Sequence, residues 1–510
     1  MEDSVIQTRN ELYKIKNISL NEERENNKLT LRKKKINEIL LKKRLNNTNI
    51  NNLQSELEIN EELLNIRKEH KINFNLLKEE IYKITDYLSS QNINYIKYAI
   101  HLLKEYSVNN DLTNEDIEII KQFKTLDLLG LILQTYNNDI QIVNEIIWIF
   151  INIQVNGSSD KDFLLSIISE KLLMLYLNLL NSNYDKIVIS ILWMLDDLVI
   201  HEKYKTIIFN HNIIEKIIDL SNLEICDVEL SQYCLQFFST LVHSLKYNKN
   251  NERDKNILNE IIKISCINLF NKNYASYYLS YKILSYISEI SDKDLLLKIE
   301  KEGAVVKILK SKFKNDNIEI VLCGVKIISN LLCGSNQLIE DLIKMRVVDF
   351  YENILKQFPQ EKQIILYSLF GLFNLSATKY EYKRCLINCI IFNETSFNYL
   401  IQSCDNFIHD IICDIMYNLS STKNIEMLKF LYDKKAILKI ISLAYQEKNS
   451  KENLLKYIKI IERYIHSFKD KEKDCIEYKN IEELYQNLIN NNTNIMDLLD
   501  DNSLNLFSQN

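Results

Sequence analysis

Two tryptophans each lie four positions before a polar residue whose side chain can bind a peptide. The pairs are Trp148 with Asn152 and Trp193 with Asp197. Residues four positions apart share one face of a helix, so the members of each pair are expected to point the same way. The Asn amide carries a donor and an acceptor that match a peptide backbone, and an indole face attracts the stem and charge of a Lys or Arg with about 0.5–2 kcal/mol. The pattern therefore predicts a surface for an extended peptide with basic side chains.

This spacing recurs along most of the chain. The two tryptophans are 45 residues apart, and Asn330, Asn374 and Asn418 follow one another at intervals of 44. Steps of 44 or 45 residues connect seven positions, and each position lies inside an apolar segment. Chance spacing of Asn in an Asn-rich chain would not explain why the apolar residues on either side also match. With the residue four positions earlier, they form the ladder pairs Trp148/Asn152, Trp193/Asp197, Phe237/Leu241, Lys282/Tyr286, Lys326/Asn330, Phe370/Asn374 and Asp414/Asn418.

The ladder must be positioned by a repeated structural unit. Each period contains an earlier amphipathic segment, for example 302–313 or 346–358. Two or three helices in about 40–47 residues are typical of armadillo or HEAT repeats. One such repeat cannot cover its own apolar face, so neighbours stack into a continuous core with a long concave surface. The sequence therefore predicts an all-α fold, an armadillo-repeat right-handed superhelical solenoid.

Glycine and proline are rare in this chain. There are 6 Gly and 1 Pro, Pro359, among 510 residues. All-β folds need turn residues every few positions, and nucleotide-binding α/β folds need Gly-rich loops, so both classes are disfavoured. A hydrophobic content of 46% is too high for a disordered chain.

Residue patterns of enzymes and metal sites are missing from the sequence. The 10 Cys have no paired CxxC spacing, which favours reduced, buried thiols over zinc ligands or disulfides. The 7 His form no HExxH motif, and neither a G-x-S-x-G motif nor a P-loop occurs. We therefore expect no enzyme, no catalytic residue, no metal and no cofactor. The first residues do not resemble a signal peptide, and no uncharged apolar run reaches the roughly 20 residues of a membrane helix, so a soluble protein is expected.

The N-terminal part is strongly basic, although the whole chain has a net charge of −6. Residues 24–44 contain nine Lys or Arg and two Glu, a local charge of +7, and −6 minus +7 leaves −13 for the rest of the chain. Like charges make a helix in this segment weakly stable alone. The asymmetry indicates a partner or an intramolecular clasp. A solvated tail, or a patch for DNA or a membrane surface, is the alternative, which the acidic remainder disfavours.

The ladder and the basic segment together resemble the importin-alpha (karyopherin-alpha) family, as a divergent member. The W-x-x-x-N ladder of that family is similar to Trp148/Asn152, and the segment around Tyr286 is similar to its variant repeat with Tyr in place of Asn. Its importin-beta-binding motif, LRKxKxxxxxLxKR, is similar to residues 31–44. The matching positions are Leu31, Arg32, Lys33, Lys35, Leu41, Lys43 and Arg44.

This resemblance implies a nuclear-import adaptor that shuttles between cytoplasm and nucleus. The basic segment would bind importin-beta, and without importin-beta it would lie in the acidic groove of its own chain and compete with cargo. The implied partners are importin-beta, proteins with basic nuclear localisation signals, and an export receptor that contacts the last repeats; neither nucleic acid nor a membrane is expected to bind directly. The residues implied for binding importin-beta and for autoinhibition are Arg24, Arg32, Lys33, Lys34, Lys35, Lys42, Lys43 and Arg44.

The resemblance is weakest where cargo would bind. Only two ladder tryptophans are present, Leu241 stands where the ladder has a polar residue, and His201 stands where the family has an acid, although Glu202 is adjacent. The region of Phe370 and Asp414 corresponds to the minor site of the family and lacks both Trp, so weak binding is expected there. The residues implied for cargo peptide are Trp148, Asn152, Trp193, Asp197, Glu202, Tyr286, Asn330, Asn374 and Asn418.

Four parts are expected along the chain: a basic importin-beta-binding segment at 1–50, a linker at 51–73, the armadillo array at 74–490 and a polar, acidic tail at 491–510. The incomplete ladder leaves a second interpretation open. This is an armadillo scaffold that binds other ligands and has no role in nuclear transport.

Overall fold

A computed structural model describes most of the repeat array. The predicted segments 1–50, 51–73 and 491–510, and with them every basic residue of 24–44, lie outside the described residues. The chain divides into two compact units, Met1–Thr240 and Leu241–Asn510, here called unit 1 and unit 2. The described residues are 77–109, 118–120, 122–157, 168–222, 228–245, 247–248, 250–271, 273–311, 313, 317–386, 406–420, 425–433, 451–468, 479, 481–483 and 485–487.

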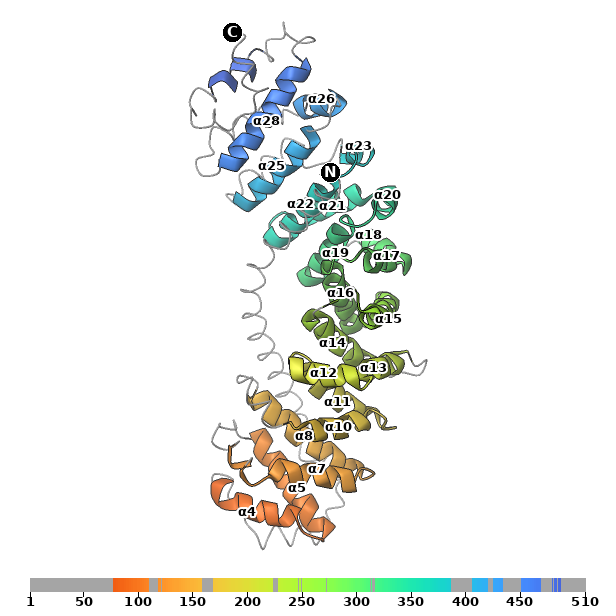
Figure 1. Cartoon of the computed structure of the whole chain (residues 1–510), viewed down its shortest axis with the longest axis vertical. Helices are drawn as coiled ribbons and strands as arrows, with labels where there is room; N and C mark the ends of the chain where they lie inside the picture. The colour runs from red at the N-terminus through yellow and green to blue at the C-terminus, as the bar shows by residue number, and fades with distance from the viewer. Residues whose placement is uncertain are drawn as a thin grey trace. The chain divides into compact units, whose positions relative to one another are not determined.

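Unit 1 is a stack of helices in chain order, drawn from orange to yellow in Figure 1. The last of them, α14, begins in unit 1 and ends in unit 2. The helices are α4 (Leu77–Leu88), α5 (Ile93–Asn109), α7 (Thr125–Thr135), α8 (Ile140–Gly157), α10 (Glu170–Leu179), α11 (Asp185–Leu198), α12 (Glu202–Asn210), α13 (Ile213–Ser221) and α14 (Val228–Ser244).

Unit 2 continues the same pattern, drawn from green to blue in Figure 1. Its helices are α15 (Glu252–Asn268), α16 (Tyr274–Glu289), α17 (Lys293–Lys301), α18 (Ala304–Lys310), α19 (Ile318–Leu331), α20 (Asn336–Lys344), α21 (Val347–Gln357), α22 (Lys362–Ser376), α23 (Tyr380–Lys383) with the 3-10 turn η2 (Arg384–Leu386), α25 (Asn406–Ser420), α26 (Ile425–Asp433) and α28 (Lys451–Phe468).

The 44-residue period falls on one helix of each repeat. These ladder helices are α8, α11, α14, α16, α19, α22 and α25, and one further step at either end reaches Ser107 in α5 and Arg463 in α28. Within unit 1, α5 packs on α8 and α8 on α11; within unit 2, α16, α19, α22, α25 and α28 pack in succession. Each ladder helix therefore buries its apolar face against the ladder helices on both sides.

Three-helix repeats are clear in α17–α18–α19 and α20–α21–α22. The second helix of each starts from a left-handed residue, Gly303 with φ 81° and Arg346 with φ 61°, and in unit 1 Asn212 with φ 54° precedes α13 in the same way. This conformation turns the chain sharply between the first two helices of a repeat. The third helix of the first of these repeats, α19, starts from a polar cap: the side chain of Asn317 accepts a bond of 3.0 Å from the Glu319 amide.

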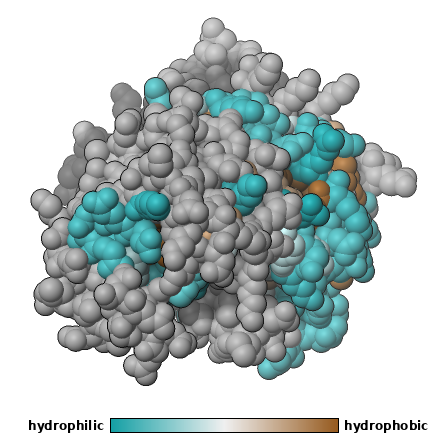
Figure 2. Space-filling view, turned by 90° about the horizontal axis from the view of Figure 1, so that it is seen from above, coloured by the Kyte–Doolittle hydropathy of each residue, from teal (hydrophilic) through white to brown (hydrophobic). Residues whose placement is uncertain are grey.

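The described residues contain no strand, and the predicted all-α, armadillo-repeat fold class is confirmed. The interior consists mainly of Ile, Leu and Tyr, including Tyr281 and Tyr351 with no exposed side-chain surface. On the face shown in Figure 2, the described residues are mostly hydrophilic, with hydrophobic atoms in small areas. A mostly polar surface over a continuous apolar core is the expected arrangement for stacked repeats.

A hydrogen-bonded contact fixes the spacing of α19, α21 and α22. The Tyr351 hydroxyl lies 3.0 Å from Ser329 Oγ, which donates to the Tyr367 carbonyl at 2.8 Å. The Tyr351 ring can pass close to α22 only because residue 371 is Gly: a Cβ there would overlap the hydroxyl oxygen and lie 2.9 Å from Ser329 Oγ. Only glycine, which has no Cβ, allows this close approach at position 371.

We expect Gly371→Ala to lower the free energy of unfolding of the full chain by about 1–3 kcal/mol, because the new methyl group forces Tyr351 out of its buried position. Urea unfolding followed by circular dichroism measures the loss. Adding Tyr351→Phe removes the oxygen that the methyl group overlaps and should restore part of the stability. An unchanged urea midpoint for Gly371→Ala would contradict this account of the packing.

Candidate functional site

Three aromatic rings from successive ladder helices form a row in unit 1. Trp148 of α8 and Trp193 of α11 contact each other edge to face, with ring centroids 5.8 Å apart and planes at 86°. Tyr233 of α14 continues the row at 6.4 Å from Trp193. All three side chains are half-buried, so part of each one reaches solvent. We call these three residues the aromatic row.

The structure changes two details of the predicted aromatic surface. The ladder position Phe237 is fully buried, and Tyr233, one helical turn earlier, takes the place next to Trp193. The two indoles contact each other directly, edge to face, so no gap is left between them. Attraction between aromatic rings in this arrangement is worth about 0.5–1.5 kcal/mol. A ligand would therefore meet the outer surface of the row rather than a slot between its rings.

Acidic side chains lie on the same helices as the aromatic row. Asp197, half-buried, follows Trp193 by one turn of α11, and the buried Asp196 accepts a bond of 3.1 Å from Gln236 of α14. The predicted Glu202 is exposed at the start of α12, with its carboxylate 3.4 Å from the ammonium of Lys205. Of these acids, Asp196 and Asp197 are on a helix of the row, whereas Glu202 is on α12 and pairs with a lysine.

A further carboxylate, not recognised from the sequence, lies one turn before Trp148. Glu145 of α8 is 3.4 Å from Lys104 Nζ and 3.8 Å from His101 Nδ1, both on α5. Burial raises the pKa of this carboxyl, but the hydrogen bond from His101 and the charge of Lys104 outweigh burial and lower the pKa below its ordinary value. Glu145 is therefore ionised at neutral pH. The signal that could have identified Glu145 in the sequence is its position, three residues before the ladder residue Trp148.

The ladder asparagines form bonds between successive ladder helices. Asn152 is 1% exposed, and Asn330 and Asn374 are each 3% exposed, whereas Asn418 is half-buried. Their amide nitrogens donate to the preceding ladder helix: Asn152 to Ser107 Oγ at 3.0 Å, Asn330 to Ser288 Oγ at 2.9 Å, Asn374 to the Ser329 carbonyl at 2.9 Å and Asn418 to Ser376 Oγ at 3.2 Å.

These bonds give the recurring amide a structural role that the sequence did not reveal. A buried amide left without a partner costs about 1–3 kcal/mol, so each bond holds one repeat in register with the next. The donors directed at the neighbouring helix are not directed at a peptide. Binding of a peptide backbone by these asparagines stays a prediction.

We expect Asn330→Ala to destabilise unit 2 by about 1–2 kcal/mol, because it removes the amide that bonds Ser288 in the neighbouring helix. A double-mutant cycle with Ser288→Ala, read by urea unfolding, should give a coupling of about 0.5–1.5 kcal/mol. Asn336→Ala, at an exposed position of α20, is the matched control. Additive effects of the two substitutions would show that the bond contributes nothing.

The ladder helices of unit 2 present rings covered by cations. The predicted Tyr286 is half-buried between the His243 ring, 4.8 Å away, and the ammonium of Lys282, which lies 6.0 Å from it and 5.8 Å from the Tyr278 ring. In the next repeat, Lys326 Nζ lies over another tyrosine ring. The surface of unit 2 therefore differs in charge from the aromatic row of unit 1.

The same occurs towards the end of unit 2. The guanidinium of Arg463 in α28 lies 4.3 Å from the Tyr417 ring and donates to the Tyr417 carbonyl at 3.2 Å and to Ser420 Oγ at 3.1 Å. Asp414, at the ladder position of a tryptophan, pairs with Lys456 at 2.7 Å. Weak binding of a basic ligand in the region of Phe370 and Asp414 stays a prediction.

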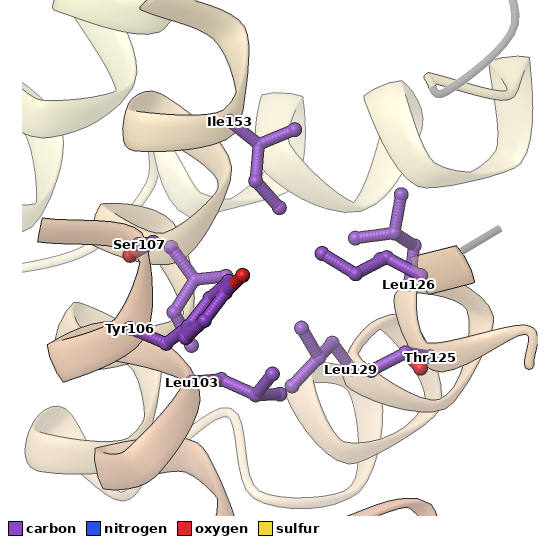
Figure 3. Close-up of a pocket in the computed structure, with 9 residues that line it drawn as sticks. Leu103, Tyr106, Ser107, Thr125, Leu126, Leu129 and Ile153 are labelled. Carbon is purple, nitrogen blue, oxygen red and sulfur yellow. The ribbon is translucent and has the colours of Figure 1, made fainter. Parts of the chain in front are cut away.

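A small cavity lies in unit 1 between α5, α7 and α8, and Figure 3 shows its lining. Leu103, Leu126, Leu129 and Ile153 make it mainly apolar. Its volume of about 10 Å³ is close to that of a single water molecule, which is too small for a substrate. The Thr125 hydroxyl at its edge is a suitable partner for such a water.

The described residues contain no group of three or more His, Cys, Asp or Glu side chains that is placed to hold a metal ion. In the same part of the chain, no helix combines the length and the apolar character needed to cross a membrane. Six cysteines are described, and none is in a disulfide.

No protein-family model matches this sequence, and no curated protein matches it. Among solved structures, one engineered protein is similar over 81% of this chain and 98% of its own, with a TM-score of 0.60 and 13% identity. A designed armadillo-repeat protein is 15% identical over 50% of this chain and 99% of its own, with a TM-score of 0.40. Another designed armadillo-repeat protein, in complex with the peptide (KR)4, is 15% identical over 52% of this chain and 99% of its own, with a TM-score of 0.38. At 13% identity the first likeness shows the fold alone, and the two lower scores carry no argument. The comparisons thus agree with a helical repeat array for this chain.

Proposed function

We propose that this protein is a nuclear-import adaptor that binds basic signal peptides on the ladder helices of unit 1. The observation that carries the proposal is the aromatic row of Trp148, Trp193 and Tyr233 on helices that also carry carboxyl groups, the ionised Glu145 on α8 and Asp197 on α11. Residues 24–44 link the adaptor to importin-beta. It shuttles between cytoplasm and nucleus and returns through an export receptor.

Chemistry of the row suits Lys and Arg side chains. The exposed face of an aromatic ring attracts a cation and covers an aliphatic stem, and Trp does this best. Asp197 lies one turn beyond Trp193, and Glu145 lies within one turn of Trp148, so a cation above either indole has a carboxylate on the same helix. A peptide crossing α8, α11 and α14 would place successive basic side chains over successive rings.

Residues 24–44, with a charge of +7, have the chemistry of such a ligand. Tethered to the array, the segment competes at high effective concentration with any basic peptide. Importin-beta would remove this competitor when it binds the segment, and cargo would then bind more tightly. Binding of importin-beta and binding of cargo are therefore coupled in this proposal.

A second function is an armadillo scaffold without a role in transport. It is favoured by the burial of Asn152, Asn330 and Asn374, whose amides bond to neighbouring helices. A surface whose polar groups serve the stack has fewer groups left to read a peptide backbone. This scaffold would bind ligands without basic character and would not respond to importin-beta.

Deleting residues 24–44 from the full chain should abolish binding to importin-beta in a pull-down and should tighten binding of a basic octapeptide, Lys and Arg in alternation, by about tenfold. Fluorescence anisotropy at two salt concentrations measures the affinity, and the gain should shrink at high salt because screening weakens the competitor. Unchanged importin-beta binding would reject the adaptor.

Trp148→Ala and Trp193→Ala should each weaken binding of the same octapeptide by roughly tenfold, because each removes a cation-binding face. Tyr184→Ala, at a ring that is 52% exposed and lies outside the row, is the matched control. Circular dichroism checks that the variants remain folded. If the tryptophan variants and the control bind alike, the aromatic row is not the peptide site.

A further inference from the structure

Lys326, in the middle of α19, lies between groups of both neighbouring ladder helices. Its Nζ is 3.1 Å from Glu289 Oε1 at the end of α16 and 4.7 Å from the centroid of the Tyr367 ring in α22. Only 12% of the Lys326 side chain is exposed. A carboxylate on one side and an aromatic face on the other are the groups with which a protein binds the lysine of a partner.

Charges of both signs lie around Lys326. Burial and the charges of Glu289 and Glu319 raise the pKa of the nearby Cys323 thiol, whereas the charges of Lys326 and Lys282 lower it, so four charged side chains lie close to this thiol. Two are positive and two are negative. Without Lys326 the group would carry one excess negative charge, beside a tyrosine face that Lys326 now covers.

Other ladder helices of unit 2 repeat this use of an internal cation. Lys282 lies over the rings of Tyr278 and Tyr286, and Arg463 lies over the ring of Tyr417. In unit 1, the rings of the aromatic row contact one another.

We propose that the Glu289–Tyr367 pair is a binding site for a lysine or arginine side chain of a basic peptide, and that Lys326 occupies it as a built-in competitor. The tethered ammonium is always present, so it displaces a free basic ligand of moderate affinity. Basic peptides are thereby kept off α16, α19 and α22. The inference concerns unit 2 alone and does not require the function proposed for unit 1.

The test replaces Lys326 in the full chain and asks where a basic peptide binds. The probe is the octapeptide of alternating Lys and Arg with a benzophenone group, cross-linked by light and mapped by mass spectrometry. Lys326→Ala opens both the carboxylate and the ring, and we expect cross-linking to residues 274–376 to reach half-maximum at a roughly tenfold lower peptide concentration than in the unsubstituted chain. Cross-links to residues 140–198 report on the aromatic row separately, so failure of either proposal is visible alone.

Three further variants make the result decisive. Adding Glu289→Gln to Lys326→Ala should remove the gain, because the carboxylate is lost. Lys356→Ala, at an exposed lysine of α21 that pairs with Glu352, removes the same charge elsewhere and should show no gain. Lys326→Gln keeps much of the stem and should show a smaller gain, and it replaces the Ala variant if circular dichroism shows that the latter is unfolded. No gain in a folded variant, a gain that survives Glu289→Gln, or an equal gain in Lys356→Ala would each overturn the inference.

Discussion

Each ladder helix has to bury a broad apolar face against the helices before and after it, because one repeat of about 44 residues cannot cover that face alone. In α19 this is visible in Ile320, Val325 and Ile328, which have no exposed surface. The helices must therefore lie close together and nearly in register. Close packing leaves room for few polar groups, and those few must find partners in a neighbouring helix.

The asparagine ladder follows from this constraint. An amide placed at the edge of a packed helix face is near enough to the preceding helix to donate to it, as Asn152 and Asn330 do to Ser107 and Ser288. The bond satisfies a buried polar group and also defines which residue of one helix lies opposite which residue of the next. A pattern that resembles a ligand-binding ladder in the sequence is in the structure also a device that holds the stack in register.

Charged and aromatic residues beside these amides define the two surfaces. In unit 1 the rings of the row contact one another, and Asp196 and Asp197 lie on the same helix as Trp193. In unit 2, Lys282 and Lys326 lie over tyrosines and neutralise the neighbouring acids. Intramolecular pairs of this kind form without the translational cost of binding a ligand, so they exclude weak external competitors.

The sequence by itself determined the helical class, the 44-residue period and the helices that carry the ladder, because hydrophobic periodicity and the scarcity of Gly and Pro are local properties. It also placed Trp148 and Trp193 on corresponding faces. Only the tertiary structure decided which atoms these residues meet: that Tyr233 rather than Phe237 extends the row, that the indoles touch, and that Lys326 reaches Glu289 and Tyr367. Such contacts join residues about 40 positions apart, and their distances depend on how helices pack and which rotamers the packing allows. Periodicity records which face a residue occupies but contains no information about those distances.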